Sequence, residues 1–159
     1  LTKKIGLSIY NFDNLDEVIK LFVPDVIQVP CNVFDRRLIE NDRINKYIAM
    51  GIQVEVRSVF LQGLLLMSDK AMLKKFSKWE AILKKWINWL DDNSINSFEA
   101  CLSFINNISG ISKIIIGVDS LEQLKQANDS MGLKKIHNFP IDIGISDQGL
   151  INPSQWSKL

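Results

Sequence analysis

Four short runs of apolar and β-branched residues alternate with longer amphipathic segments along the 159-residue chain. The runs predict strands at Lys3–Ser8, Asp25–Val29, Ile52–Ser58 and Ser112–Ile116. The segments between and after them predict helices at Leu15–Leu21, Asp35–Met50, Lys70–Leu90, Asn96–Ile108 and Ser120–Met131, before a loop-like tail. Because helices separate all the strands, we expect a parallel sheet with right-handed crossovers.

This (βα)×4 order fits two architectures. One is a small, doubly wound open sheet, and the other is half of a TIM-type (β/α)8 barrel, which in full has about 250 residues. In both architectures the functional residues gather at the carboxyl ends of the strands. In this chain those ends are Ser8, Gln28–Asn32, Arg57 with Ser58, and Gly117.

The third predicted strand has one apolar and one polar face. Its alternating pattern places Gln53, Glu55 and Arg57 opposite a face of isoleucine and valine. A strand of a parallel sheet that helices cover on both sides is apolar on both faces. The polar face, which ends in Arg57 and Ser58, therefore favours a strand that lines the mouth of a ligand-binding barrel or sheet.

Composition excludes several functional classes. A length of 159 residues supports one domain, residues 1–159, with a core of its own. The formal net charge of +1 gives no reason to expect binding to nucleic acid or to an acidic membrane. No apolar run reaches the roughly 18 residues of a membrane span. Cys31 and Cys101 have neither disulfide nor metal-ligand spacing, so we expect buried thiols, a reducing cytoplasmic location and no metal site.

Five segments, in the same order and at the same spacing, resemble the C-terminal half of an aldo/keto reductase. They are IGLSIY (Ile5–Tyr10), DVIQVPCNVFDRR (Asp25–Arg37), GIQVEVRSVFLQGLLL (Gly51–Leu66), IIIGVDSLEQL (Ile114–Leu124) and GLINPSQW (Gly149–Trp156). That family has an NAD(P)H-binding (β/α)8 barrel, so the resemblance implies that this chain holds strands five to eight. It also implies an oxidoreductase that reduces a small carbonyl substrate by hydride transfer from NADPH or NADH.

The resemblance assigns contacts with the nicotinamide end of the cofactor to three residues. Ser8 and Gln28 match residues that bind the carboxamide. Arg57 occupies the position of an aromatic residue that stacks on the nicotinamide ring, and a planar guanidinium can also stack on a π-face. Two alternatives from the residues alone stay open: Gln28 is a buried polar group satisfied by a neighbouring strand, and Arg57 pairs with Glu55.

Four further residues match the phosphate and adenosine end of the cofactor site. Ser58 and Phe60 match the loop at the pyrophosphate, and Gly117 matches the turn near the adenosine phosphate. Gln123 matches a position on the last helix that is arginine or glutamine in the family. Ser120 and Gln123 also form an S-x-x-Q capping box, so Gln123 is equally expected to cap its own helix.

The catalytic tetrad of the family, Asp, Tyr, Lys and His, belongs to its first four β/α units. We therefore identify no catalytic residue in this chain and predict that the chain alone is inactive. A half-barrel also has unpaired edge strands, which predicts association with an N-terminal half-barrel or with a second copy. The alternatives are a non-catalytic nucleotide-binding or interaction protein on the same scaffold, and a flavodoxin-like domain with an open sheet.

Overall fold

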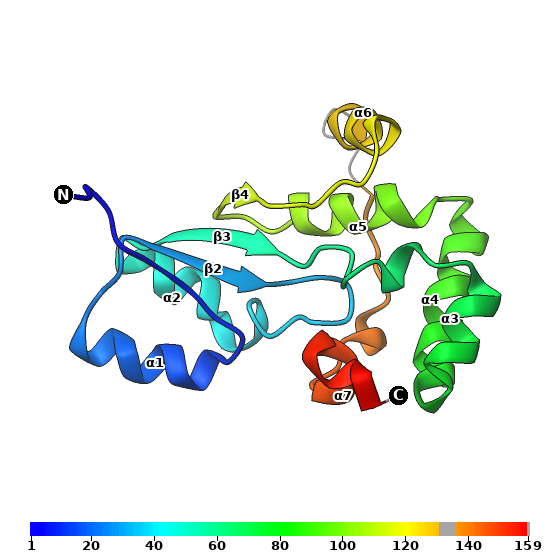
Figure 1. The fold of residues 1–159 in the computed structure, drawn as a ribbon, viewed down its shortest axis with the longest axis horizontal. Coiled ribbons are helices and arrows are strands. Elements are labelled where there is room, and N and C mark those ends of the chain that lie inside the picture. The colour runs from blue at the N-terminus through cyan, green and yellow to red at the C-terminus, as the bar shows by residue number, and fades with distance from the viewer. Residues whose placement is uncertain (131–135, 159) are drawn as a thin grey trace.

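The computed structural model describes residues 1–130 and 136–158 and is an α/β structure (Figure 1). Its strands are β1 (Gly6–Ser8), β2 (Val26–Pro30), β3 (Gln53–Arg57) and β4 (Ile111–Ile114). The α-helices of the described residues are α1 (Phe12–Leu21), α2 (Arg43–Ala49), α3 (Asp69–Lys75), α4 (Glu80–Asn93), α5 (Ser97–Asn106), α6 (Leu121–Ser130) and α7 (Gln148–Ile151).

The strands form one parallel sheet in the chain order β1-β2-β3-β4. A doubly wound sheet would instead reverse its strand order partway along. The helices after β1 and β2, α1 and α2, lie on the same side of β2 and β3, and the helical segments α3 to α5 lie beyond the carboxyl end of β3 (Figure 1). This arrangement is the (βα)4 half of a TIM-type barrel, so the half-barrel prediction is confirmed and the flavodoxin-like alternative is wrong.

The two faces of the sheet differ in polarity. On the helix-covered face, Ile27, Val29, Val54 and Val56 are completely buried. The opposite face carries one residue from each strand in register, Ser8, Gln28, Glu55 and Lys113, which we call the inner row. The two outer members of the inner row are exposed and the two central ones are half-buried. The polar face predicted for the third strand is thus the concave face of the half-barrel.

Two helix starts follow from N-caps that the sequence contains. Asn96 precedes α5, as predicted, and its side-chain oxygen accepts a hydrogen bond from the backbone N–H of Glu99 at 2.9 Å. α1 begins at Phe12 rather than Leu15, because the side chain of Asn11 accepts from the backbone N–H of Asp13 at 2.8 Å. Both caps satisfy amide donors that a helix leaves unpaired at its start.

The helix predicted at Asp35–Met50 is wrong in its first half. Regular α-helix begins only at Arg43, after a short 3₁₀ turn at Glu40–Asp42. The side chain of Asn32 accepts hydrogen bonds from the amides of Phe34 and Asp35, at 3.0 and 2.9 Å. Such a side-chain turn competes with helical hydrogen bonding, so the segment after β2 remains a loop.

The helix predicted at Lys70–Leu90 is also broken, at Phe76, into α3, a 3₁₀ turn at Ser77–Trp79, and α4. The break lets the Phe76 ring pack edge-on against Trp156, with ring centroids 4.8 Å apart, a tertiary contact that outweighs local helix propensity. Among the described residues, none of the helices has the length and apolar character needed to cross a bilayer.

The chain ends differ from prediction as well. The tail is not loop-like but contains α7 and 3₁₀ turns at Ile141–Ile143 and Pro153–Lys158. It is fastened to the loop after β2 by Arg36, which donates to the backbone carbonyl of Pro140 at 2.7 Å. The last residue of the helix predicted at Ser120–Met131 lies outside the described residues. Cys31 and Cys101 are free and buried, as predicted.

Candidate functional site

A cleft of about 480 Å³ opens at the carboxyl end of the sheet. Its walls are the loop that follows β3, the segment between β4 and α6, and Tyr10 and Phe98 from two further parts of the chain. Strands that run parallel bring their carboxyl ends to one edge, so residues far apart in sequence meet there. Five of the seven predicted cofactor residues, Arg57, Ser58, Phe60, Gly117 and Gln123, line this cleft.

The loop after β3 has an unusual backbone. Ser58, Leu61 and Gln62 adopt left-handed conformations with φ of 60°, 46° and 51°, and Gly63 follows with φ of 79°. Left-handed conformations are unfavourable for residues other than glycine, and they cluster at ligand-binding loops. Within the described part of the chain, the amides of Phe60, Gln62 and Gly63 donate no hydrogen bond. The amide of Leu61 donates to the carbonyl of Ser58, so only Gln62 and Gly63 are consecutive, and neighbouring unpaired amides in such a turn are typical of an anion-binding concavity.

Arg57 is the last residue of β3 and lies at the mouth of the cleft. Its guanidinium stacks on the ring of Tyr10, with the central carbon 4.1 Å from the ring centroid. Nη2 donates to the backbone carbonyl of Ile9 at 2.8 Å, and Nη1 donates to the hydroxyl of Ser58 at 3.1 Å. The predicted alternative, an Arg57–Glu55 pair, is wrong, because Glu55 pairs instead with Lys113 at 2.8 Å.

The opposite wall of the cleft comes from the turn before α6. Gly117 has no neighbouring atom within 4 Å of the position that a Cβ would occupy, so its backbone borders open space. The side chain of Gln123 accepts from the amide of Asp119 at 2.8 Å, and the amide of Gln123 donates to Ser120 at 3.1 Å. The predicted capping box is therefore confirmed, and the capping residue also lines the cleft.

Ser8 and Gln28 lie outside this cleft, on the inner row. The pKa of Glu55 is lowered by the hydrogen bond from Lys113 and, to a smaller extent, by one from Gln28. Gln28 thus has a partner on the neighbouring strand, as its alternative interpretation predicted. Both residues remain open to a ligand on the concave face, because neither Ser8 nor Gln28 is fully buried.

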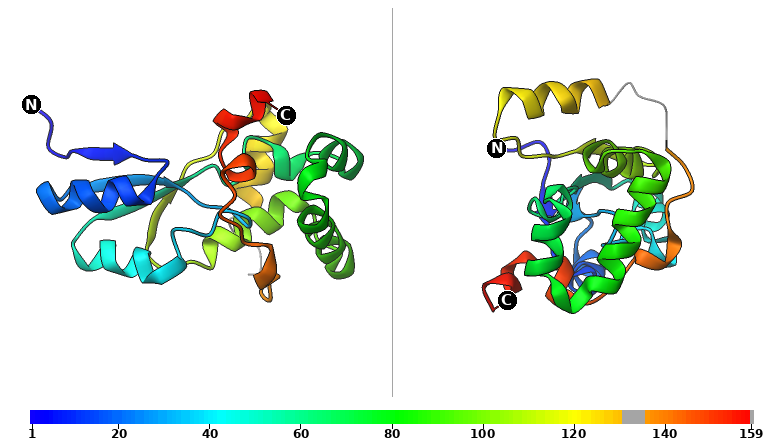
Figure 2. Two further views of the ribbon diagram at one scale, coloured as in Figure 1. Left: turned by 90° about the horizontal axis from the view of Figure 1, so that it is seen from below. Right: turned by 90° about the vertical axis from the view of Figure 1, so that its right-hand side faces the viewer.

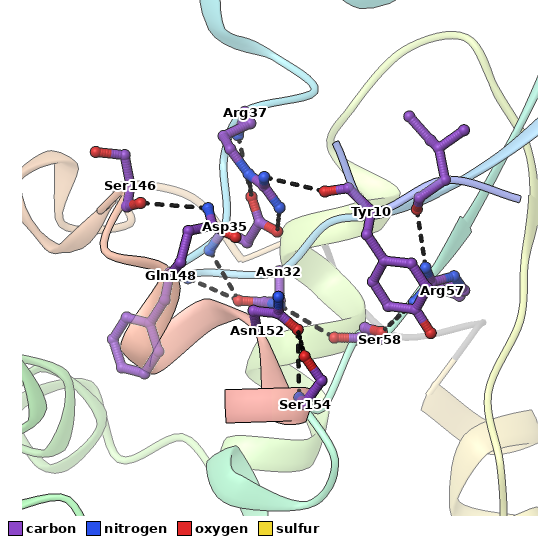
Figure 3. Close-up of polar contacts among 12 residues, drawn as sticks. Tyr10, Asn32, Asp35, Arg37, Arg57, Ser58, Ser146, Gln148, Asn152 and Ser154 are labelled. Atoms are coloured by element: carbon purple, nitrogen blue, oxygen red, sulfur yellow. Dashed lines mark hydrogen bonds and ion pairs between the residues drawn. The ribbon is translucent and has the colours of Figure 1, made fainter. Parts of the chain in front are cut away.

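A second polar cluster, which sequence reasoning missed, supports the segment that carries Tyr10 (Figure 3). Asp35 is completely buried and accepts two hydrogen bonds from the side chain of Arg37, from Nε at 2.8 Å and from Nη2 at 2.7 Å. Nη1 of Arg37 donates to the backbone carbonyl of Tyr10 at 3.2 Å. Arg37 and Arg57 therefore hold the consecutive carbonyls of Ile9 and Tyr10.

The cleft also contains residues to which the sequence analysis assigned no role, among them Tyr10, Gln62 and Asp119. Tyr10 was available to prediction, because it follows the carboxyl end of β1 by two residues. Asp119 lies further from its strand, five residues after the end of β4. Functional residues of such a sheet are therefore to be sought at the last residue of each strand and also in the several residues that follow it.

The model of the aldo/keto reductase family matches residues 1–138 of this chain. A search of curated proteins finds no match.

Proposed function

Since this chain belongs to the aldo/keto reductase family, we propose that it supplies the cofactor-binding half of an NAD(P)H-dependent carbonyl reductase. Membership of the family indicates an oxidoreductase, and the family generally uses NAD(P)H. The observation that carries the proposal is the cleft at the carboxyl end of the sheet, where Arg57, Ser58 and Phe60 from one segment meet Gly117 and Gln123 from another.

The residues of the cleft fit a dinucleotide. The unpaired amides of Phe60, Gln62 and Gly63 suit the pyrophosphate, since backbone N–H groups bind phosphate oxygens well. Gly117 leaves room for close approach of a phosphate to the backbone. At the other end, Arg57 and Tyr10 present a flat stacked pair, and Gln28 offers an amide for the carboxamide. NADPH is the first choice of cofactor and NADH the second.

In this proposal the chain contributes positioning rather than proton transfer. When bound, the cofactor supplies the hydride that reduces a small carbonyl substrate. Arg57 and Gln28 would hold the nicotinamide ring in place, which is the orientation part of catalysis. The tetrad that the family uses belongs to the first four β/α units, whereas this chain corresponds to units five to eight. We therefore expect the chain alone to be inactive.

The edges of the sheet support a partner for the half-barrel. β1 and β4 are each paired on one side only, and unpaired parallel edges are sites of strand addition. Large apolar side chains are exposed near both edges, including Ile5 at 51% and Ile115 at 37%. We propose that an N-terminal half-barrel or a second copy covers these edges. The buried, free thiols of Cys31 and Cys101 support a reducing compartment, and we propose a cytoplasmic location.

Titration of the purified chain with NADPH and NADH, followed by cofactor fluorescence, tests this proposal. Gly117→Ala is the informative variant, because the added Cβ enters open space in the cleft and leaves the fold intact. We expect this variant to weaken NADPH binding without changing the thermal unfolding midpoint. Gln53→Ala is the matched control, because Gln53 is an exposed residue of β3 outside the cleft. A folded chain that binds neither cofactor would contradict the proposal.

The alternative is a non-catalytic nucleotide-binding or interaction protein on the same scaffold. The binding experiment does not separate the two, but complementation does. Addition of an N-terminal half-barrel that carries the tetrad should restore carbonyl reduction if the chain is the cofactor half. Cofactor binding with no activity in the complemented barrel would favour the alternative.

A further inference from the structure

Two charged side chains lie on opposite walls of the cleft at the carboxyl end of the sheet. Among the described residues that line it, Arg57 is the only cation and Asp119 is the only anion. Arg57 ends β3, whereas Asp119 lies in the turn between β4 and α6. A charged group at the wall of a cleft attracts one sign of charge and repels the other. The two walls therefore favour different parts of a ligand.

The cleft continues toward α5 and α6, which lie side by side (Figure 2). A second pocket, of about 400 Å³, adjoins it there and shares three of its lining residues, Leu66, Phe98 and Gln123. The other described residues of this pocket are also uncharged: Asn96, Ser97 and Gln126. The proposed function places the nicotinamide at Arg57, so the adenosine of the dinucleotide extends to this side. Of the described residues, only Asp119 brings a charge to that end.

Asp119 is available to a ligand. Its side chain is exposed and makes no hydrogen bond or ion pair with the other described residues. Its backbone is fixed, because its amide donates to the side chain of Gln123 at 2.8 Å. The cations nearest in sequence do not offset the carboxylate, since Lys113 pairs with Glu55 at 2.8 Å and Lys125 lines neither pocket.

NADH and NADPH differ by one group, a phosphate on the 2′-hydroxyl of the adenosine ribose. A carboxylate accepts a strong hydrogen bond from a hydroxyl. It repels a phosphate, which carries about −1.5 to −2 charges at neutral pH. Dinucleotide sites on the unrelated doubly wound fold use the same contrast, with an acidic residue at the ribose of NAD and an arginine at the phosphate of NADP.

We propose that Asp119 selects NADH over NADPH, because its carboxylate accepts a hydrogen bond from the 2′-hydroxyl and repels the 2′-phosphate. This inference rests on the proposed function and deepens it. It reverses the order in which the two cofactors were named above, since that order follows the family and not the charges of this cleft. Asp119 thereby becomes the specificity-determining residue of the adenosine end.

The test titrates the purified chain with NADH and with NADPH and follows cofactor fluorescence. We expect NADPH to bind at least about tenfold more weakly than NADH, the scale of repulsion between close like charges in water. Added salt should narrow this difference, because it screens exposed charges. Asp119→Asn should bring the two Kd values within about threefold, mainly by strengthening NADPH binding. Glu122→Gln is the matched control, since it removes the same charge from an exposed residue that lines neither pocket.

Equal or tighter binding of NADPH by the wild-type chain would overturn the inference and leave the proposed function standing. An NADH preference that Asp119→Asn leaves unchanged, or that Glu122→Gln removes equally, would also overturn it, because the selecting charge would then lie elsewhere. A folded chain that binds neither cofactor would overturn the proposed function and the inference with it. The wild-type Kd ratio and its salt dependence test the inference even if Asp119→Asn fails to fold.

Discussion

Removal of the Arg37 charge should destabilise this fold more than its position near the surface suggests. Arg37→Met keeps most of the side-chain volume but leaves the carboxylate of Asp35 without its cation. The Asp35 side chain is 0% exposed and the Arg37 side chain is 14% exposed, so solvent cannot replace the lost partner. Removing one member of such a buried pair costs about 3–5 kcal/mol. That loss is a large part of the total stability of a typical domain, about 5–15 kcal/mol.

A double-mutant cycle isolates the cause. Asp35→Asn with Arg37→Met removes both charges, so the double variant should be more stable than Arg37→Met alone, by about 1–2 kcal/mol. Urea unfolding followed by tryptophan fluorescence measures each variant, because Trp86 is completely buried and reports loss of the core. A loss of less than about 1 kcal/mol in Arg37→Met, or a double variant that loses as much stability as the single variant, would show that the buried charge pair does not hold the fold together.

Two further predictions concern the cleft and the core. Arg57→Gln should strengthen binding of NADP+ relative to NADPH several-fold. The reason is that a cation stacked at about 4 Å disfavours the positively charged oxidised ring by about 1 kcal/mol even in water. The measurement is the ratio of the Kd values for NADP+ and NADPH, and an unchanged ratio would place the nicotinamide elsewhere. Burial raises the pKa of the Cys101 thiol from 9.0 to about 12 and raises that of Cys31 as well. Their contribution to stability is therefore complete below pH 9.0 and is lost as the pH rises toward about 12. Urea unfolding across this range should show the decline, and Cys101→Ala should reduce it.

The accuracy of the fold prediction follows from how local each determining interaction is. The start of α5 depends on one side chain, Asn96, and an amide three residues away, so the sequence contains the whole signal. The order of strands and helices is also local, because it rests on hydrophobic periodicity. By contrast, the break at Phe76 depends on its contact with Trp156, eighty positions along the chain. Periodicity predicts a continuous helix there, since both segments share one apolar stripe.

The site prediction was likewise accurate for local features and incomplete for contacts between distant residues. The rule about strand ends identified Arg57, Ser58 and Gly117, which the structure brings to one cleft. Sequence could not reveal that Tyr10 covers the guanidinium, because that contact joins two strands that are not neighbours in the sheet. Gln28 was assigned to the same site from the family motif, but it projects from the inner row rather than into the cleft.

The strand order has a consequence for symmetry. Two copies that closed one barrel would pair β4 of each copy with β1 of the other, which forms two identical seams about a twofold axis. All strands would then point the same way along that axis, so both copies would open their clefts on one rim. Such a dimer would hold two equivalent dinucleotide sites across a shared mouth. It would therefore bind two molecules of NADPH per barrel, whereas a barrel closed by a different half would bind a single equivalent.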